Sequence, residues 1–249
     1  MCKYALKHSV FFLEAAPSFS FYCPFRAPVK CAMMKGEWKR SVKHVKQPRN
    51  PRRLVVKVGT STLAHATGRL NIRHVEELVK VLSDLKNAGH QIILVSSGAI
   101  AMGFGKLNLP ERPKDVPTKQ ASAAVGQCEL MYTYDRLFGQ YNHTVAQMLL
   151  TWEDFDHEQR RRNLQNTLER LLQLRAIPII NENDPVACEE YSLGDNDTLA
   201  ALVATCIHAD LVVLLSDIDG LYTADPHTHP EAELIPVVEE ITPEIELLA

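Results

Sequence analysis

Residues 54–59 read Leu-Val-Val-Lys-Val-Gly, an apolar and β-branched run that ends in a glycine. Such a run is typical of a buried strand that enters a tight loop. Residues 91–96, Gln-Ile-Ile-Leu-Val-Ser, form a second run of this kind. Between the two runs, apolar residues recur at helical spacing over 72–85, and Gly89 follows as a stop signal. A strand, a helix and a second strand in this order predict two parallel strands joined by a crossover helix.

The same alternation continues toward the end of the chain. The spacing of apolar residues predicts helices over 120–141, 158–175 and 198–206, and strands over 145–150, 177–180 and 211–215. Helices between successive strands place parallel strands side by side and cover both faces of the sheet. The predicted fold class is therefore α/β, an open and mainly parallel sheet sandwiched by helices.

Charge divides the 249 residues into two regions. Residues 1–53 contain twelve basic and two acidic side chains, whereas the remainder contains fifteen basic and twenty-eight acidic ones. We interpret residues 1–51 as a basic leader that is disordered or lies upstream of the true start, and 52–249 as the folded domain. A secretory signal is an alternative for the apolar stretch 8–25, but Glu14 and Pro17 interrupt it.

Composition also limits the partners and the compartment. The acidic body argues against nucleic acid as a partner, and no apolar run approaches the length of a membrane span. The six cysteines are scattered and form no Cys-x-x-Cys pair, which argues against a zinc site or a redox dithiol. We interpret the cysteines of the body as reduced thiols, which predicts a cytoplasmic protein.

Small and polar residues follow four of the predicted strands. Lys57 and Gly59 end the first, Ser97 and Gly98 follow the second, and polar residues follow those ending near 180 and 215. In an open α/β sheet, ligands bind outside the carboxyl ends of the strands. Four such ends together favour a ligand site at this edge.

Lysine and glycine at a strand end suit a phosphate ligand. The ammonium of Lys57 can reach the edge of the sheet, and glycines let backbone amides approach anionic oxygens. The alternative is an ordinary strand lysine that reaches solvent. The sequence contains neither the Gly-x-x-x-x-Gly-Lys-Ser/Thr loop nor a Gly-x-Gly-x-x-Gly fingerprint after a strand, so a dinucleotide oxidoreductase is the weakest rival.

Seven blocks of sequence, in order, resemble the glutamate 5-kinase family over about residues 52–249. The blocks around Lys57 and Ser97 are similar to those of the wider amino-acid-kinase superfamily, and the Asn-Glu-Asn-Asp and Gly-Asp-Asn-Asp blocks are the specific ones. The blocks are Leu-Val-Val-Lys-Val-Gly-Thr-Ser at 54–61, Val-Ser-Ser-Gly-Ala-Ile at 95–100, Ala-Val-Gly-Gln at 124–127, Val-Ala-Gln-Met-Leu-Leu-Thr at 145–151, Pro-Ile-Ile-Asn-Glu-Asn-Asp at 178–184, Gly-Asp-Asn-Asp-Thr-Leu-Ala at 194–200 and Leu-Ser-Asp-Ile-Asp-Gly-Leu-Tyr-Thr-Ala-Asp-Pro at 215–226.

The resemblance implies phosphorylation of the γ-carboxylate of L-glutamate by ATP, the first step of proline biosynthesis. Mg²⁺ would be bound through the nucleotide phosphates, with no metal ligands from the protein. The resemblance also implies a homo-oligomer and feedback inhibition by proline. By it, the catalytic residues are Lys57 and Asp197, the glutamate-binding residues are Ser97, Asp184 and Asn196, the nucleotide-binding residues are Lys57, Ser216 and Asp217, and Asn181 and Asp195 lie beside the glutamate site.

Two parts of the family pattern are not found in the sequence. These are a later glycine-rich segment with a second catalytic lysine, and the C-terminal PUA domain. Thr242-Pro243-Glu244 is a helix-start signal close to the last residue, so we expect a domain that lacks its C-terminal part and has little or no kinase activity. The rivals are a non-catalytic fragment that binds glutamate or proline, and another amino-acid kinase, such as an acetylglutamate kinase or an aspartokinase.

Overall fold

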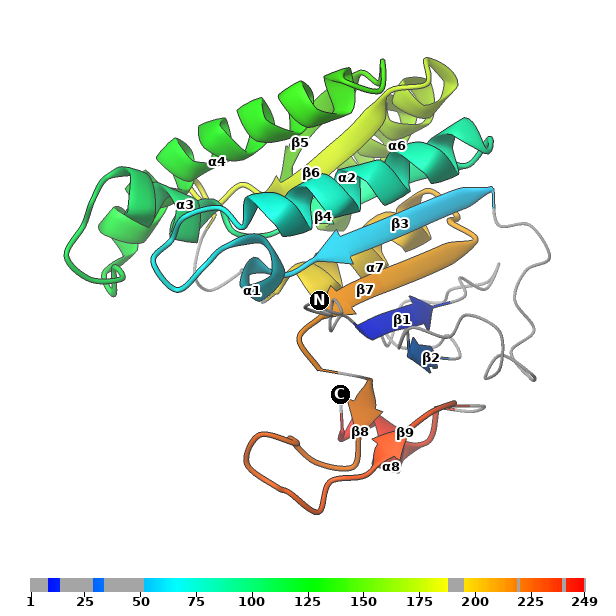
Figure 1. Ribbon diagram of the computed structural model, residues 1–249. Helices are drawn as coiled ribbons and strands as arrows, with labels where there is room; N and C mark the ends of the chain where they lie inside the picture. Colours follow the sequence, from blue (N-terminus) through cyan, green and yellow to red (C-terminus); the bar gives the residue numbers. More distant parts are fainter. Residues whose placement is uncertain are drawn as a thin grey trace, which may run out of the picture.

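The computed structural model describes residues 9–13, 29–33, 52–187, 195–218, 220–238 and 241–248 (Figure 1). Gly194, part of one family block, and most of the predicted leader lie outside the described residues. Everything below concerns the described part of the chain.

Five parallel strands form the centre of the sheet, as the sequence predicts. They lie in the order β7-β3-β4-β6-β5, and every neighbouring pair is parallel. Each expected strand is present, two of them with the predicted ends and the others with ends within two residues of the prediction. The strands are β3 (Arg53–Val58), β4 (Gln91–Ser96), β5 (Val145–Leu150), β6 (Ile177–Glu182) and β7 (Leu211–Ser216).

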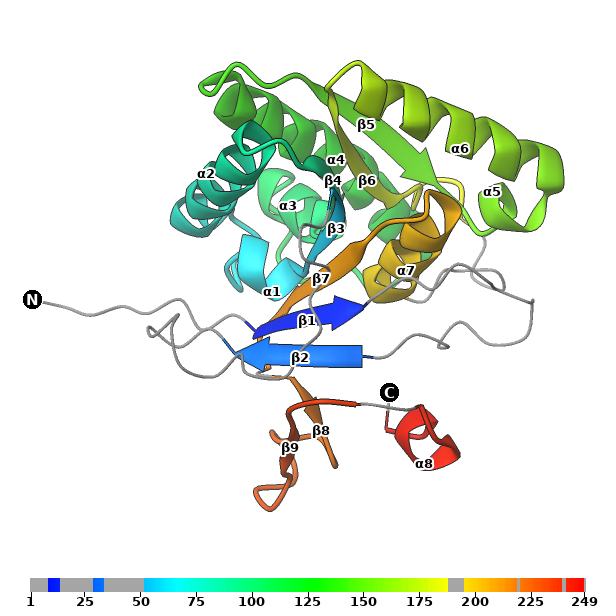
Figure 2. The same cartoon turned by 90° about the vertical axis from the view of Figure 1, so that its right-hand side faces the viewer.

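Helices cover both faces of this sheet, which confirms the predicted α/β architecture (Figures 1 and 2). One face is covered by α2 (Ile72–Asn87), α3 (Ala99–Lys106) and α4 (Val116–Gly139). The other face is covered by α6 (Glu158–Gln173) and α7 (Asn196–Cys206). Two short helices, α1 (Thr60–Leu63) and α5 (Glu153–Asp156), follow β3 and β5.

The two faces of the sheet build two separate apolar cores. In β3, Val56 packs with α2 and α4, whereas its neighbour Val55 packs with α6 and α7. Successive side chains of a strand point to opposite faces, so a strand buried on both sides must be apolar throughout. This requirement explains why the central strands are continuous, β-branched runs. Packing on both faces also holds the strand ends in a fixed position.

Two segments of the leader extend the sheet. Strand β1 (Ser9–Leu13) pairs antiparallel with β7, and β2 (Val29–Met33) pairs antiparallel with β1. The sequence analysis interpreted residues 1–51 as disordered or as lying upstream of the true start, and these ten residues form strands rather than a disordered segment. The physical reason is the open edge of β7, whose free N–H and C=O groups favour pairing with an added strand.

The last described segment lies outside the sheet (Figure 2). Strands β8 (Leu221–Tyr222) and β9 (Leu234–Ile235) pair with each other, and a short helix, α8 (Pro243–Glu246), follows. Thr242 caps α8 by accepting a hydrogen bond from the backbone N–H of Ile245, as the start signal predicts. Among the described residues, no helix is both long enough and apolar enough to cross a bilayer.

Candidate active site

A cavity of about 850 Å³ opens at the edge where the parallel strands end. The loops after β3, β4 and β6 and the first turn of α7 form part of its wall, so the wall combines segments far apart in sequence. This is the edge at which the sequence predicts ligand binding. The polar and charged residues on the wall are Thr60, Ser61, His65, Ser97, Arg112, Lys119, Asn181, Glu182, Asp184, Asp195 and Asn196.

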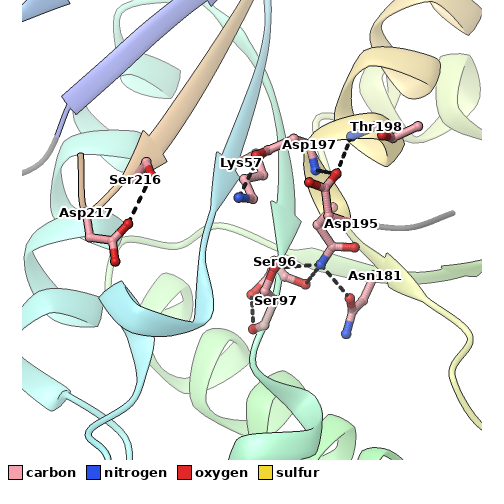
Figure 3. A network of polar contacts seen from close by, with 10 residues as sticks. Lys57, Ser96, Ser97, Asn181, Asp195, Asp197, Thr198, Ser216 and Asp217 are labelled. Carbon is pink, nitrogen blue, oxygen red and sulfur yellow. Dashed lines mark hydrogen bonds and ion pairs between the residues drawn. The ribbon is translucent and has the colours of Figure 1, made fainter. Parts of the chain in front are cut away.

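Lys57 and Asp197 form an ion pair beside this cavity (Figure 3). The Nζ of Lys57 lies 2.6 Å from Oδ1 of Asp197, with side-chain exposures of 11% and 42%. The contact is an ion pair rather than a well-aligned hydrogen bond, because Oδ1 of Asp197 has no hydrogen-bond partner of good geometry among the described residues. The structure therefore brings together the two residues that the resemblance implies are catalytic.

Asn196 links the ends of β4 and β6. Its Nδ2 group lies 2.7 Å from the Oγ of Ser97, 3.0 Å from the Oδ1 of Asn181 and 3.2 Å from the carbonyl oxygen of Ser96. An amide nitrogen carries two hydrogens, so these three acceptors share both of them. The side chain is thereby held in one orientation at the cavity wall.

Further buried polar side chains contact the residues that Asn196 binds. The Nδ2 of Asn181 donates to the Oε1 of Gln127 at 2.9 Å, and both side chains are buried. The hydroxyls of Ser96 and Tyr134 lie 2.9 Å apart, and burial raises the pKa of Tyr134 above its ordinary value. Buried polar groups that are fully paired fix the conformation of the groups they contact. Gln127 ends the Ala-Val-Gly-Gln block but was given no role from the sequence, and Tyr134 was not singled out.

Asp195 has a structural function at the start of α7. Its Oδ1 accepts hydrogen bonds from the backbone N–H groups of Asp197 and Thr198, both at 3.0 Å (Figure 3). This is N-terminal capping, which satisfies amides that have no partner within the helix. Asp195 therefore positions the residues that follow it, and it also lies on the cavity wall.

Gly98 allows the chain to turn from β4 into α3. It has a φ of 99°, a left-handed conformation that glycine adopts without strain. The N–H of Ser97, just before it, donates to the carbonyl oxygen of Val58 and so ties this turn to the end of β3. Gly98 also lies on the cavity wall.

Two carboxylates at the end of β6 make one wall of the cavity acidic. Glu182 and Asp184 both line it, and both also line a smaller cavity of about 430 Å³ beside α4. Burial, and after it the charge of Glu182, raises the pKa of Asp184 to about 6. A carboxylate with this cost of ionisation is suited to a cationic ligand group, which would offset the cost.

Ser216 and Asp217 lie at the end of β7, on the other side of β3 from Ser97 and Asn181 (Figure 3). The Oγ of Ser216 donates to the Oδ1 of Asp217 at 3.2 Å, and neither residue is on the cavity wall. Strand β7 is the neighbour of β3, and the N–H of Gly59 donates to the carbonyl oxygen of Leu215. The residues expected to bind nucleotide therefore lie on the opposite side of β3 from the cavity.

The cavity also contains charged residues that sequence reasoning missed. Arg112 and Lys119 come from the loop before α4 and from its first turns, and Glu182 comes from the end of β6. Glu182 lies inside the Asn-Glu-Asn-Asp block, so its place in that block could have identified it as a residue of the site. Nothing in the polar, proline-containing segment around Arg112 indicated that it folds toward the strand ends.

No group of three or more His, Cys, Asp or Glu side chains in the described ranges could hold a metal ion. The two cysteines that the structure describes in the body, Cys128 and Cys206, are free thiols.

The fold and a family comparison together define the class of protein to which the chain belongs. The amino acid kinase family matches residues 52–245. Isopentenyl phosphate kinase from T. acidophilum, solved as a product complex, superposes with a TM-score of 0.52 over 74% of this chain and 78% of that chain. Its sequence identity of 19% means that this likeness supports the fold alone.

The chain belongs to the amino acid kinase family and, within it, to the glutamate 5-kinases. It is 52% identical over 205 residues to the glutamate 5-kinase of Listeria innocua, covering 81% of this chain and 74% of the relative. It is 54% identical over 202 residues to that of Carboxydothermus hydrogenoformans, covering 81% and 54%. The chain thus spans about three quarters of the first relative and about half of the second.

Proposed function

We propose that this chain transfers the γ-phosphoryl group of ATP to the side-chain carboxylate of L-glutamate, producing glutamyl 5-phosphate. The observation that carries the proposal is the position of the Lys57–Asp197 ion pair beside a cavity whose wall presents Ser97, Asn196 and Asp184. This arrangement would place a cation for phosphoryl transfer next to a pocket for the amino acid. The identity to the curated glutamate 5-kinases supports the choice of acceptor.

The reaction needs positioning and charge more than proton transfer. A glutamate carboxylate is ionised at neutral pH, so its oxygen can attack the γ-phosphorus without a general base. The bond from that phosphorus to the β,γ-bridging oxygen breaks, and ADP leaves with the electron pair. Lys57 would stabilise the negative charge on the transferred group, and Asp197 would hold the Lys57 ammonium in place.

The glutamate would lie along the cavity from Ser97 toward the end of β6. Its ammonium group requires acceptors, and Asp184 together with Glu182 supplies carboxylates there. Ionisation of Asp184 costs free energy in the empty site, and an ammonium partner would offset that cost. Ser97 has a hydroxyl hydrogen that can point toward the ligand, since its oxygen accepts from Asn196.

The nucleotide would lie on the β7 side, where Ser216 and Asp217 follow the strand. Mg²⁺, bound by the nucleotide phosphates, would neutralise part of their charge. We also propose a cytoplasmic location, which the free thiols of Cys128 and Cys206 support. Participation in proline biosynthesis, inhibition by proline and assembly into a homo-oligomer are proposals that rest on the family resemblance.

Calorimetry and turnover together test the function. We expect the chain to bind L-glutamate more tightly than L-aspartate or N-acetylglutamate. Conversion of ATP to ADP should require glutamate, and it should be far slower in this chain than in a version extended through the family's later glycine-rich segment. Asp184→Ala should weaken glutamate by on the order of 2–3 kcal/mol and leave ATP affinity unchanged. Asp135→Ala, an exposed carboxylate on α4, is the matched control.

Each alternative predicts a different pattern in these assays. Binding of glutamate without ATP turnover would identify a non-catalytic binding fragment. Preference for aspartate or N-acetylglutamate would identify another amino-acid kinase. Equal weakening of glutamate and ATP by Asp184→Ala would contradict the assignment of this residue to the glutamate subsite.

A further inference from the structure

The cavity wall carries more carboxylates than cations, and this excess constrains how glutamate would bind. Among the described lining residues, three are carboxylates, Glu182, Asp184 and Asp195, and only Arg112 and Lys119 carry a permanent positive charge. Glutamate brings one ammonium group and two carboxylates. If the proposed function holds, the acidic side chains bind the ammonium group of glutamate. Each of its two carboxylates then needs cations or hydrogen-bond donors of its own.

The donors nearest the phosphoryl-transfer end are already engaged. The two hydrogens of the Asn196 amide are shared among three protein acceptors. The ammonium of Lys57 is paired with Asp197 and does not lie on the cavity wall. Asn196 and Lys57 lie at the reacting end of the site, where they would contact the γ-carboxylate of glutamate. The α-carboxylate therefore requires a cation elsewhere on the wall.

Lys119 fits this requirement better than Arg112. Lys119 is partly buried and projects from α4, a helix of 24 residues whose start is capped by Asp115. Arg112 is exposed and lies in the loop before the helix. A group on a rigid helix loses less freedom on binding a ligand than one on a loop.

No described carboxylate forms an ion pair with Lys119. Its charge contributes to the lowered pKa of Asp115, but hydrogen bonding to Thr118 is the main cause of that lowering. Asp115 is exposed and is engaged as the helix cap, so it leaves the Lys119 ammonium available. We propose that Lys119 binds the α-carboxylate of the amino-acid substrate and selects for acceptors that carry one.

The test compares two ligands that differ only at the α-carboxylate. Isothermal calorimetry on the full chain would measure the affinity for L-glutamate and for its α-amide, isoglutamine, in wild type and in Lys119→Met. We expect the substitution to weaken glutamate about 10- to 100-fold, the cost of one hydrogen bond to a charged group. Isoglutamine should change by less than about 3-fold, so the preference for glutamate should largely disappear.

Controls separate this inference from a structural effect and from the proposed function. Lys114→Met changes an exposed lysine paired with Glu111 on the same loop, and it should leave both affinities unchanged. Lys119→Arg should retain most of the preference for glutamate. Equal weakening of both ligands by Lys119→Met, or no weakening of either, would overturn the inference. Failure of the wild-type chain to bind glutamate would instead refute the proposed function.

Discussion

The ion pair between Lys57 and Asp197 predicts an asymmetry between two substitutions. Asp197→Asn removes the carboxylate charge and leaves the Lys57 ammonium in a site where its side chain is only 11% exposed. Lys57→Met removes the buried charge and replaces it with an apolar chain of similar length. Deleting one partner of a buried pair is costly because the remaining charge is desolvated without compensation, and this cost is smaller when the remaining charge is partly exposed, as Asp197 is.

The exposure of the two side chains sets the size of the effect. A fully buried pair costs about 3–5 kcal/mol when one partner is lost. Asp197 is 42% exposed, so water screens the pair, and we expect Asp197→Asn to cost about 1–2 kcal/mol. For a domain of this size, that loss corresponds to a fall of about 2–8 °C in Tm. Lys57→Met leaves the Asp197 carboxylate unpaired but partly exposed to water, so it should cost less than Asp197→Asn.

Urea denaturation and turnover measured on the same proteins test this reasoning. The double variant Lys57→Met/Asp197→Asn should be more stable than Asp197→Asn alone, because it no longer buries an unpaired ammonium. Lys57→Met should nevertheless reduce kcat about 10²-fold or more if Lys57 stabilises the transition state. A double variant that is less stable than either single variant would refute the electrostatic argument. Near-normal kcat in Lys57→Met would refute its catalytic role.

Three further predictions concern other sites. Asp184→Asn should raise the Tm of the ligand-free protein at pH 7 but not at pH 4. The folded-state pKa of Asp184, about 6, is above its ordinary value of 3.8, so the stability it contributes is complete below about pH 4 and lost as the pH rises through 6. Gly126→Ala should cost about 1–3 kcal/mol in urea denaturation, because the new Cβ would overlap the Ala99 carbonyl oxygen of α3. Gly139→Ala, which has open space around it, is the control and should be near neutral. A chain starting at Pro51 should keep its affinity for glutamate in calorimetry, because the cavity wall begins at Thr60. A loss of affinity would show that the preceding residues support the site.

The central sheet was predictable because its strands carry a strong local signal. A strand buried on both faces must be apolar throughout, and each such run here ends abruptly at a small or polar residue. Parallel strands bring their carboxyl ends to one edge, so Lys57, Ser97 and Asn181 could be placed together without coordinates. Their roles in binding and catalysis remain predictions.

Contacts between segments that lie far apart in the sequence were harder to predict. Helix α3 was not expected, because its glycine-rich sequence has a low helix propensity. Its close packing against α4 depends on Gly103 and Gly126, where any side chain would overlap backbone atoms of the other helix. Gln127 and Lys119 are separated by about two turns of α4, yet one supports Asn181 and the other faces the cavity. Helical periodicity alone cannot tell which partner each side of a long helix will meet.

The start of α7 connects the two halves of the proposed reaction. Asn196 and Asp197 are adjacent in sequence, and one contacts Ser97 at the cavity wall while the other pairs with Lys57. Asp195 holds this turn by accepting hydrogen bonds from the backbone N–H groups of Asp197 and Thr198. A shift of this turn would therefore move the amino-acid subsite and the phosphoryl-transfer lysine together. Asp195→Ala should accordingly weaken glutamate binding and reduce kcat in the same variant, whereas Asp195→Ser, which retains a capping oxygen, should restore much of both. A variant that lost one property and kept the other would show that the two halves are positioned independently.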